Sequence, residues 1–212
     1  MDDTLYPEAK FVESGFRAVD EYASKKYEIK DFHNQALSLF KSGVRTNIFD
    51  RILLKLKVKN HTEIVKEFLE VYRNHKPKIF LHEDAKWALD FFSKNKKLVL
   101  ISDGYLKVQS NKFKALKISS YFDRPYFTDE WGKSAWKPSL YVFKKIEEDY
   151  SVEGSNCVYI ADNPRKDFIA PNILGWQSIQ IKRPGGEYFD TSYPLNGKPH
   201  HVIETLYELK EI

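Results

Sequence analysis

The sequence predicts an α/β fold, in which a parallel sheet carries helices on both faces, together with an inserted all-helical segment. From residue 7 to about residue 75, apolar residues recur every three or four positions, which is typical of amphipathic helices. Beyond residue 77, short apolar runs alternate with helical stretches, which favours a parallel sheet. A chain of 212 residues can form one medium domain with a small insert. We therefore expect a core built from residues 1–7 and 77–212 and a helical unit over residues 8–76.

The helical segment contains four apolar stripes with helical spacing. Each stripe places apolar side chains on one face of a helix, which then has to be buried against the others. No convincing strand pattern interrupts them, so the segment is predicted to be a four-helix unit. The stripes cover residues 11–22, 32–40, 48–56 and 64–72.

The remaining chain alternates between predicted strands and helices. The run Leu98-Val99-Leu100-Ile101 is continuous and apolar, as expected of a strand buried on both faces. Ligands of parallel α/β sheets bind at the carboxyl ends of the strands. The residues that follow each strand are therefore the first to consider. The predicted strands are 98–101, 124–128, 157–160 and 178–181, and the predicted helices are 84–94, 105–116, 139–150, 167–174 and 201–209.

The first of these strands ends in Ser102-Asp103-Gly104. A hydroxyl and a glycine at the start of a helix suit an anion, because the free N–H groups and the helix dipole favour negative charge. The glycine also lets the backbone approach a ligand closely. Taken alone, the tripeptide is explained better by ordinary turn and capping chemistry.

Two further segments carry charge that a phosphate site would use. Strand 157–160 is followed by Asp162 and Asp167, whose hard oxygen ligands suit Mg²⁺. Lys137, before Pro138, could neutralise a substrate phosphate and a nucleophilic carboxylate in the same cleft. A turn with a capping aspartate, and a solvated lysine, are the structural alternatives.

Taken in order, these segments resemble the haloacid dehalogenase-like hydrolases. The chain opens with Asp2-Asp3-Thr4-Leu5-Tyr6 and continues with Ser-Asp-Gly after a strand, Lys-Pro, and Asp-Asn-Pro-Arg-Lys-Asp after another strand. The family's first motif is Asp-x-Asp-x-Thr at the end of a strand. The resemblance covers nearly the whole chain and implies a Rossmann-like core, with the helical segment as the family's cap.

The resemblance also implies a reaction and a set of roles. It implies phosphoryl transfer through an aspartyl-phosphate, with Mg²⁺ as the cofactor and a small phosphorylated metabolite as the substrate. Such a reaction depends mainly on charge neutralisation and in-line positioning. Arg45, in a predicted loop between cap helices, could select an anionic substrate. The implied sites are catalytic Asp2, Thr4 and Lys137; phosphate-binding Ser102, Asp103, Gly104 and Lys137; and metal-binding Asp2, Asp162 and Asp167.

The first motif departs from the family pattern. If Thr4 is the motif threonine, Asp2 takes the acid/base position and the nucleophile would stand immediately before Met1. The apolar strand that should carry it would also be missing, and its neighbours in the sheet would be left without a partner. A start assigned too late, a truncated chain and a non-catalytic relative remain open. A second register makes Asp2 the nucleophile and places Tyr6 at the threonine position.

Composition excludes several other classes of protein. The single Cys157 excludes a disulfide framework, a cysteine zinc cluster and an iron–sulfur site. A net charge of +4 without a basic block gives little support for a nucleic-acid partner. No apolar run approaches the ~18 residues of a membrane span, and the acidic start does not resemble a signal peptide. We expect a cytoplasmic enzyme. The alternatives are a non-catalytic phosphate-binding module and, less favoured by the paired carboxylates, a 2-haloacid dehalogenase.

Overall fold

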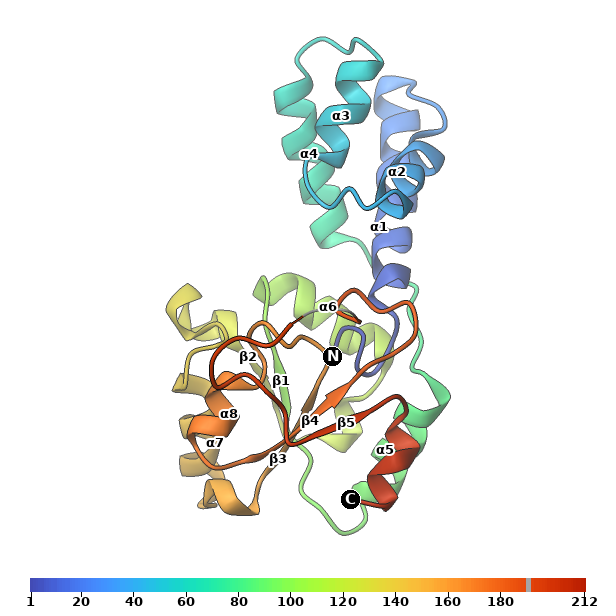
Figure 1. Ribbon diagram of the computed structural model, residues 1–212. Helices are drawn as coiled ribbons and strands as arrows, with labels where there is room; N and C mark the ends of the chain where they lie inside the picture. Colours follow the sequence, from blue (N-terminus) through green and yellow to red (C-terminus); the bar gives the residue numbers. More distant parts are fainter. Residues whose placement is uncertain (190–191) are drawn as a thin grey trace. The chain divides into compact units, whose positions relative to one another are not determined.

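The computed structural model describes residues 1–189 and 192–212. The chain divides into two compact units, one of Met1–Glu8 with Phe80–Ile212 and the other of Ala9–Ile79 (Figure 1). Each unit has a hydrophobic core of its own. No helix among the described residues is both long enough and apolar enough to cross a membrane.

The smaller unit is a set of helices packed around aromatic side chains. Phe32 and Phe68 meet edge to face with their centroids 5.1 Å apart. Gly15 makes room for another ring, because a Cβ at this position would lie 2.4 Å from the Tyr72 ring. The four predicted apolar stripes thus form the buried faces of four helices, α1 (Glu8–Tyr27), α2 (Phe32–Lys41), α3 (Ile48–Lys55) and α4 (His61–Asn74).

The larger unit has the α/β Rossmann-like fold. Its strands are all parallel to the neighbours with which they pair. They are β1 (Leu100–Ser102), β2 (Pro125–Phe127), β3 (Val158–Ala161), β4 (Gln177–Ile181) and β5 (His201–Ile203). Figure 1 shows α7 and α8 on one side of the strands and α5 on the other. The helices of this unit are α5 (Glu83–Phe92), α6 (Leu106–Leu116), α7 (Tyr141–Tyr150) and α8 (Ile169–Ile173).

The strands form two separate sheets. β1 pairs with β2, and β3 pairs with β4, which pairs in turn with β5. Within the described residues, the second edge of β1 and the second edge of β3 have no strand partner. A cavity of about 1310 Å³ is lined by residues of both strands. The interruption falls between β1, which ends at Ser102, and β3, which Asp162 follows.

The prediction of a helix over residues 201–209 is wrong. His201 to Ile203 form β5, because the β-branched Val202 and Ile203 extend the sheet beside Gln180 and Ile181 of β4. A short 3₁₀ helix, Leu206–Lys210, follows. Thr205 begins it with a capping box in which Glu208 returns a hydrogen bond to the backbone.

Two other helices start later than their sequence pattern suggests. α7 begins at Tyr141, two residues later than predicted, so Lys137 and Pro138 lie in the loop before it rather than directly at its start. α8 begins at Ile169, because Asp167 accepts a hydrogen bond from the backbone N–H of Asn163 and belongs to the preceding turn. Lys137 thus lies in the loop between β2 and α7, and Asp167 lies in the loop between β3 and α8.

Candidate active site

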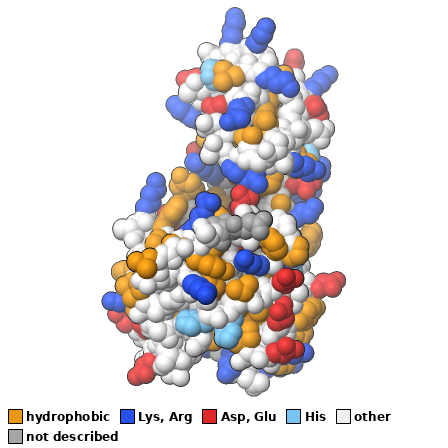
Figure 2. Space-filling view, viewed as in Figure 1, with side chains coloured by type: hydrophobic (Ala, Val, Ile, Leu, Met, Phe, Trp, Pro, Cys, Tyr) orange, Lys and Arg blue, Asp and Glu red, His pale blue; other side chains and the backbone are white. Residues whose placement is uncertain are grey.

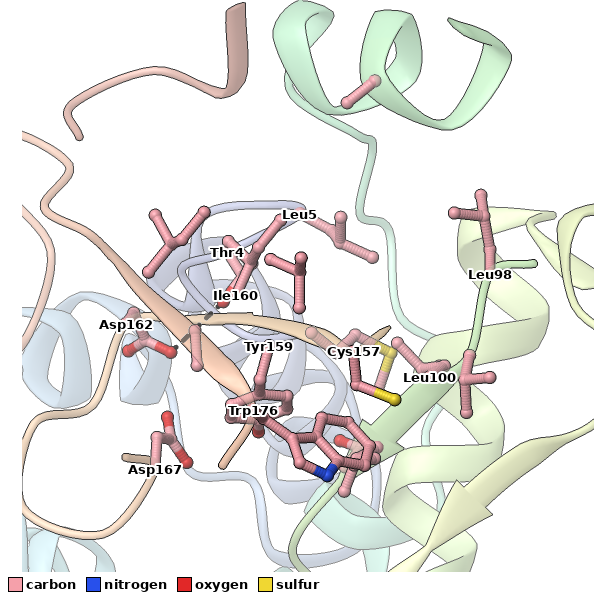
Figure 3. A pocket seen from close by; sticks show the side chains of 18 of the residues that line it. Thr4, Leu5, Leu98, Leu100, Cys157, Tyr159, Ile160, Asp162, Asp167 and Trp176 are labelled. Atoms are coloured by element: carbon pink, nitrogen blue, oxygen red, sulfur yellow. Dashed lines mark hydrogen bonds between the residues drawn. The ribbon is translucent and has the colours of Figure 1, made fainter. Parts of the chain in front are cut away.

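The carboxyl ends of β1 and β3 meet at one end of the cavity. Lys166, which follows β3, places its Nζ 2.7 Å from Oδ2 of Asp103, which follows β1. This contact means that the two strands run in the same direction. Figure 3 shows Asp162 and Asp167 at one end of the cavity and Leu98, Leu100 and Cys157 at the other. The predicted site residues that line the cavity are Asp2, Thr4, Ser102, Asp103, Gly104, Lys137, Asp162 and Asp167.

Lys137 is the central cation of this group. Its buried Nζ lies 2.6 Å from Asp167 Oδ1 and 3.0 Å from the hydroxyl of Tyr159 on β3. Burial alone would lower the pKa of Lys137, but the adjacent Asp167 carboxylate raises it well above its usual value. The ammonium is therefore charged at every physiological pH and can attract an anion.

Thr4 connects the first segment of the chain to the loop after β3. Its hydroxyl donates a hydrogen bond to Asp162 Oδ1 at 3.3 Å, shown as a dashed line in Figure 3. Burial, and then the negative charge of Asp167, raise the pKa of Asp162 to about 8. Thr4 rather than Tyr6 contacts Asp162, which favours the register in which Thr4 is the motif threonine.

Asp2 is held by two side chains. Lys112 Nζ lies 2.6 Å from Asp2 Oδ1, and the Tyr6 hydroxyl donates to the same oxygen. Burial opposes ionisation, but the positive charge of Lys112 holds the pKa of Asp2 below its usual range. Glu8 lines the same cavity, and burial together with Asp2 raises the pKa of Glu8 to about 7.

The Ser102-Asp103-Gly104 segment is organised by hydrogen bonds around it. Ser102 Oγ is bonded to the buried Gln109 side chain at 3.0 Å. Gly104 has a φ of +119°, and a Cβ there would lie 2.7 Å from Gln109 Nε2, so only glycine fits. The Asp103 carboxylate accepts bonds from Thr128 Oγ1 and from the backbone N–H of Lys137. Asp103 therefore holds the loop in place, and its backbone, rather than its carboxylate, is suited to meet an anion.

The start of α6 differs from the expected anion site in one respect. The backbone N–H of Leu106, at the first position of α6, donates to Asp129 Oδ2 at 2.9 Å. This N–H group is thus already satisfied by a carboxylate. An anion at this helix start would therefore not be bound by the Leu106 N–H.

Several buried residues of the site were not predicted from the sequence. One face of α6 has residues at the helical spacing i, i+3, i+4 and i+7, and all four are buried: Gln109, Lys112, Phe113 and Leu116. The first two of these residues are polar. Polar residues in an otherwise apolar stripe were a usable signal. Arg183, by contrast, lies in the loop after β4 and donates a hydrogen bond to the carbonyl oxygen of Thr4 at 2.9 Å. No local sequence pattern predicts this contact.

Arg45 lies in the helical unit. Its guanidinium donates to the Phe40 carbonyl oxygen at 2.6 Å and lies 4.2 Å from the centre of the Phe40 ring. The side chain is exposed, and its role in choosing a substrate stays a prediction.

The oxygen atoms of the site fit a magnesium ion in part. Asp162 and Asp167 are near enough for the charge of one to raise the pKa of the other, and a divalent cation would relieve this repulsion. No three His, Cys, Asp or Glu side chains gather as a metal site among the described residues. Mg²⁺ commonly uses one or two carboxylates and completes its shell with waters and substrate oxygens. Asp162 and Asp167 supply the two carboxylates of that pattern.

Sequence comparison relates this chain to known hydrolases. Residues 1–181 match the family described as haloacid dehalogenase-like hydrolase. The N-acylneuraminate-9-phosphatase of Rattus norvegicus is 28% identical over 130 residues, which cover 61% of this chain and 50% of that protein. The corresponding Mus musculus protein is 25% identical over 131 residues, or 62% of this chain and 51% of that protein. The matched segment thus spans about half the length of these relatives.

Solved structures share the fold at low identity. A HAD phosphatase from Thermococcus onnurineus is 22% identical, with a TM-score of 0.62, over 100% of this chain and 94% of that chain. The HAD-hydrolase YfnB from Bacillus subtilis, described as bound to magnesium, is 14% identical with a TM-score of 0.68 over the same shares. Together with the family match over most of the sequence, the fold and the motif order show that this chain belongs to the haloacid dehalogenase-like hydrolases.

Proposed function

We propose that this protein is a Mg²⁺-dependent phosphatase that hydrolyses a small phosphorylated metabolite. The observation that carries the proposal is the buried Lys137, which lies against Asp167 in the cavity that Thr4 and Ser102 also line. A buried cation beside hydroxyl and backbone N–H donors is suited to a phosphoryl group, whose transfer depends on charge neutralisation and positioning. The phosphatase relatives agree with this substrate class.

The proposed reaction has two steps. An aspartate immediately ahead of Met1 attacks phosphorus. The negative charge of the bound phosphate raises the pKa of Asp2 in the complex, and the alcohol leaves as the protonated Asp2 gives it a proton. Water then attacks the aspartyl-phosphate while Asp2 takes a proton from that water, which restores the aspartate and releases phosphate. A carboxylate nucleophile divides the hydrolysis into two easier steps. Lys112 and Tyr6 hold the Asp2 carboxylate in one place for both transfers.

The other side chains bind and orient the phosphoryl group. Lys137 and Ser102 meet its oxygens, while the Asp103 carboxylate fixes the loop between them. Asp162, Asp167 and the Asp2 carbonyl oxygen would hold Mg²⁺, which supplies further positive charge at the transferring group when it is bound. Arg45 is proposed to contribute to substrate choice.

The test is phosphate binding by variants of two lysines in the same segment. Lys137→Met should weaken the affinity for phosphate roughly 10- to 100-fold in titration calorimetry with Mg²⁺, because a charge-assisted hydrogen bond is worth about 1.5–3 kcal/mol. Lys133→Met, four residues earlier and exposed, is the control and should bind normally. Ser102→Ala provides a second, milder variant that should also weaken binding.

Two results would contradict the proposal. Equal phosphate affinity in Lys137→Met and Lys133→Met, with both variants folded by circular dichroism, would remove Lys137 from the site. Phosphate binding without any turnover of para-nitrophenyl phosphate, once an aspartate stands ahead of Met1, would favour a non-catalytic phosphate-binding relative.

A further inference from the structure

The cations around the candidate active site are mostly held by aspartates. The pairs are Lys112 with Asp2, Lys137 with Asp167, Lys166 with Asp103 and Arg183 with Asp84. Arg165, in the loop after β3, is different, because its exposed side chain forms no ion pair among the residues that the structure describes. Its positive charge is therefore available to an anionic ligand.

Arg165 lies against Tyr188, a residue of the cavity wall. The Cζ atom of Arg165 is 5.8 Å from the centre of the Tyr188 ring, and Tyr188 lines the cavity together with Glu8 and Asp162. Burial, and then the negative charges of Glu8 and Asp162, raise the pKa of Tyr188 to about 12. The hydroxyl is therefore protonated at physiological pH and can donate a hydrogen bond. Tyr188 and Arg165 thus present an O–H donor and a positive charge side by side.

The loops that carry this pair are held in place by hydrogen bonds. The backbone N–H of Arg165 donates to Asn163 Oδ1 at 3.0 Å. The buried Asp3 carboxylate accepts a hydrogen bond, also of 3.0 Å, from the backbone N–H of Glu187, which precedes Tyr188. Groups that are fixed before a ligand arrives lose less conformational entropy when it binds. The backbone is thus preorganised at both residues of the pair.

The leaving group of the proposed reaction departs on the side of the phosphate site where Tyr188 lies. Asp2 is the residue that gives the leaving oxygen its proton. The charge of Asp2 raises the pKa of Glu8, and the charge of Glu8 raises the pKa of Tyr188, so these side chains lie near one another. A substituent on the leaving alcohol would therefore meet Tyr188 and the adjacent Arg165.

We propose that Tyr188 and Arg165 bind a carboxylate on the leaving alcohol, so that the substrate is the phosphate ester of a hydroxy acid. A carboxylate has two oxygens in one plane, which suit the planar guanidinium and the phenol O–H donor. On the face of the larger unit seen in Figure 2, Lys and Arg side chains stand apart from one another, which favours a small acid over a polyanion. The inference rests on the proposed function and adds the substrate class of the same site.

The experiment compares two ligands that differ only in this group. Glycerate 3-phosphate carries a carboxylate where glycerol 3-phosphate carries a hydroxymethyl group, and the affinity of each is measured by titration calorimetry with the 212-residue chain and Mg²⁺. We expect glycerate 3-phosphate to bind about tenfold more tightly, because a hydrogen bond to a charged group contributes a factor of roughly 10 or more. The preference should shrink at high salt, since the charge of the exposed guanidinium is screened. Because binding is measured, the result does not depend on turnover.

Two variants of the pair and one matched control locate the carboxylate. Arg165→Met should remove most of the preference for glycerate 3-phosphate, because it removes the positive charge. Tyr188→Phe keeps the ring but loses the hydroxyl donor, and it should remove part of the preference. Arg124→Met is the control, because Arg124 is also exposed and its Cζ lies 4.6 Å from the centre of a tyrosine ring, that of Tyr126 on β2. It should keep the full preference.

The outcomes separate this inference from the proposed function. Equal affinity for the two ligands, in a chain that binds inorganic phosphate, would overturn this inference and leave the proposed phosphatase site intact. If inorganic phosphate does not bind, both proposals fail. A preference that Arg165→Met and Tyr188→Phe both retain, with each variant folded by circular dichroism, would assign the carboxylate to another cation and overturn the inference. Arg165 is exposed, so its replacement should leave the fold intact.

Discussion

Replacing Arg183 with methionine should remove the cation that holds Asp84 ionised inside the α/β unit. Arg183 makes two contacts of 3.0 Å with the two carboxylate oxygens of Asp84, and the side chains are only 11% and 7% exposed. The same guanidinium binds the Thr4 carbonyl oxygen, and the backbone N–H of Leu206 donates to Asp84 at 2.8 Å. This ion pair thus joins the first segment of the site to α5 and to the 3₁₀ helix near the end of the chain.

The size of the effect follows from burial. Removing one partner of a buried ion pair leaves an uncompensated charge, which typically costs about 3–5 kcal/mol. Lys86→Met is the matched control, because Lys86 and Asp90 lie on the same helix at 2.7 Å but are 64% and 47% exposed. An exposed pair contributes little to stability. Urea unfolding at pH 7 should therefore show a large loss for Arg183→Met and almost none for Lys86→Met.

The loss should also depend on pH. Burial alone would raise the pKa of Asp84, but Arg183 and the Leu206 N–H hold it below its usual range. A carboxyl group with a depressed pKa contributes stability that is present above its unfolded pKa, ~3.9, and is lost as pH falls through the folded value. The difference between wild type and Arg183→Met should therefore shrink below about pH 4. A loss equal to that of Lys86→Met, or one independent of pH, would refute this reasoning.

Three further predictions concern the helical unit, the metal and Asp2. Gly15→Ala should destabilise the chain by about 1–3 kcal/mol in urea unfolding, because its Cβ would overlap the Tyr72 ring, and an unchanged midpoint would show that the ring can move. Asp162→Asn should weaken Mg²⁺ binding in titration calorimetry, since it removes one of two carboxylates, and unchanged affinity would exclude Asp162 as a ligand. Lys112 holds the Asp2 carboxylate, so in a chain with an aspartate placed ahead of Met1, Lys112→Met should lower kcat more than it changes KM. Lys112→Arg keeps the positive charge and should restore part of kcat. An equal loss of kcat in both variants would indicate that Lys112 only packs in the core.

Much of the fold was predictable because it rests on local patterns. Continuous apolar runs identify the strands, and helical spacing identifies the four helices of the smaller unit. The last strand was not predictable in this way, because His201-Val202-Ile203 is too short to show a period. Pairing with β4 decided its conformation, and that partner lies more than twenty residues away in the chain.

The site was predictable where its residues follow strands. Parallel strands bring their carboxyl ends together, so Ser102, Asp162 and the neighbouring Lys137 could be expected in one place. The residues that hold them could not, because Arg183 acts through long-range contacts that have no sequence signature. The sequence already placed Asp103 at the expected phosphate site, but only the structure shows that its carboxylate is occupied by Thr128 and Lys166.

The central claim, hydrolysis through an aspartyl-phosphate, is tested most directly by extending the chain. An apolar strand that ends in aspartate immediately before Met1 is compared with the same strand ending in asparagine, and both are assayed with para-nitrophenyl phosphate in Mg²⁺. A well-oriented nucleophile supplies roughly 7–11 kcal/mol of the barrier, so the aspartate form should turn over many orders of magnitude faster. It should also form a phosphoenzyme that hydroxylamine cleaves. Equal turnover by two folded forms would contradict the account and make Asp2 the first residue to test as the nucleophile.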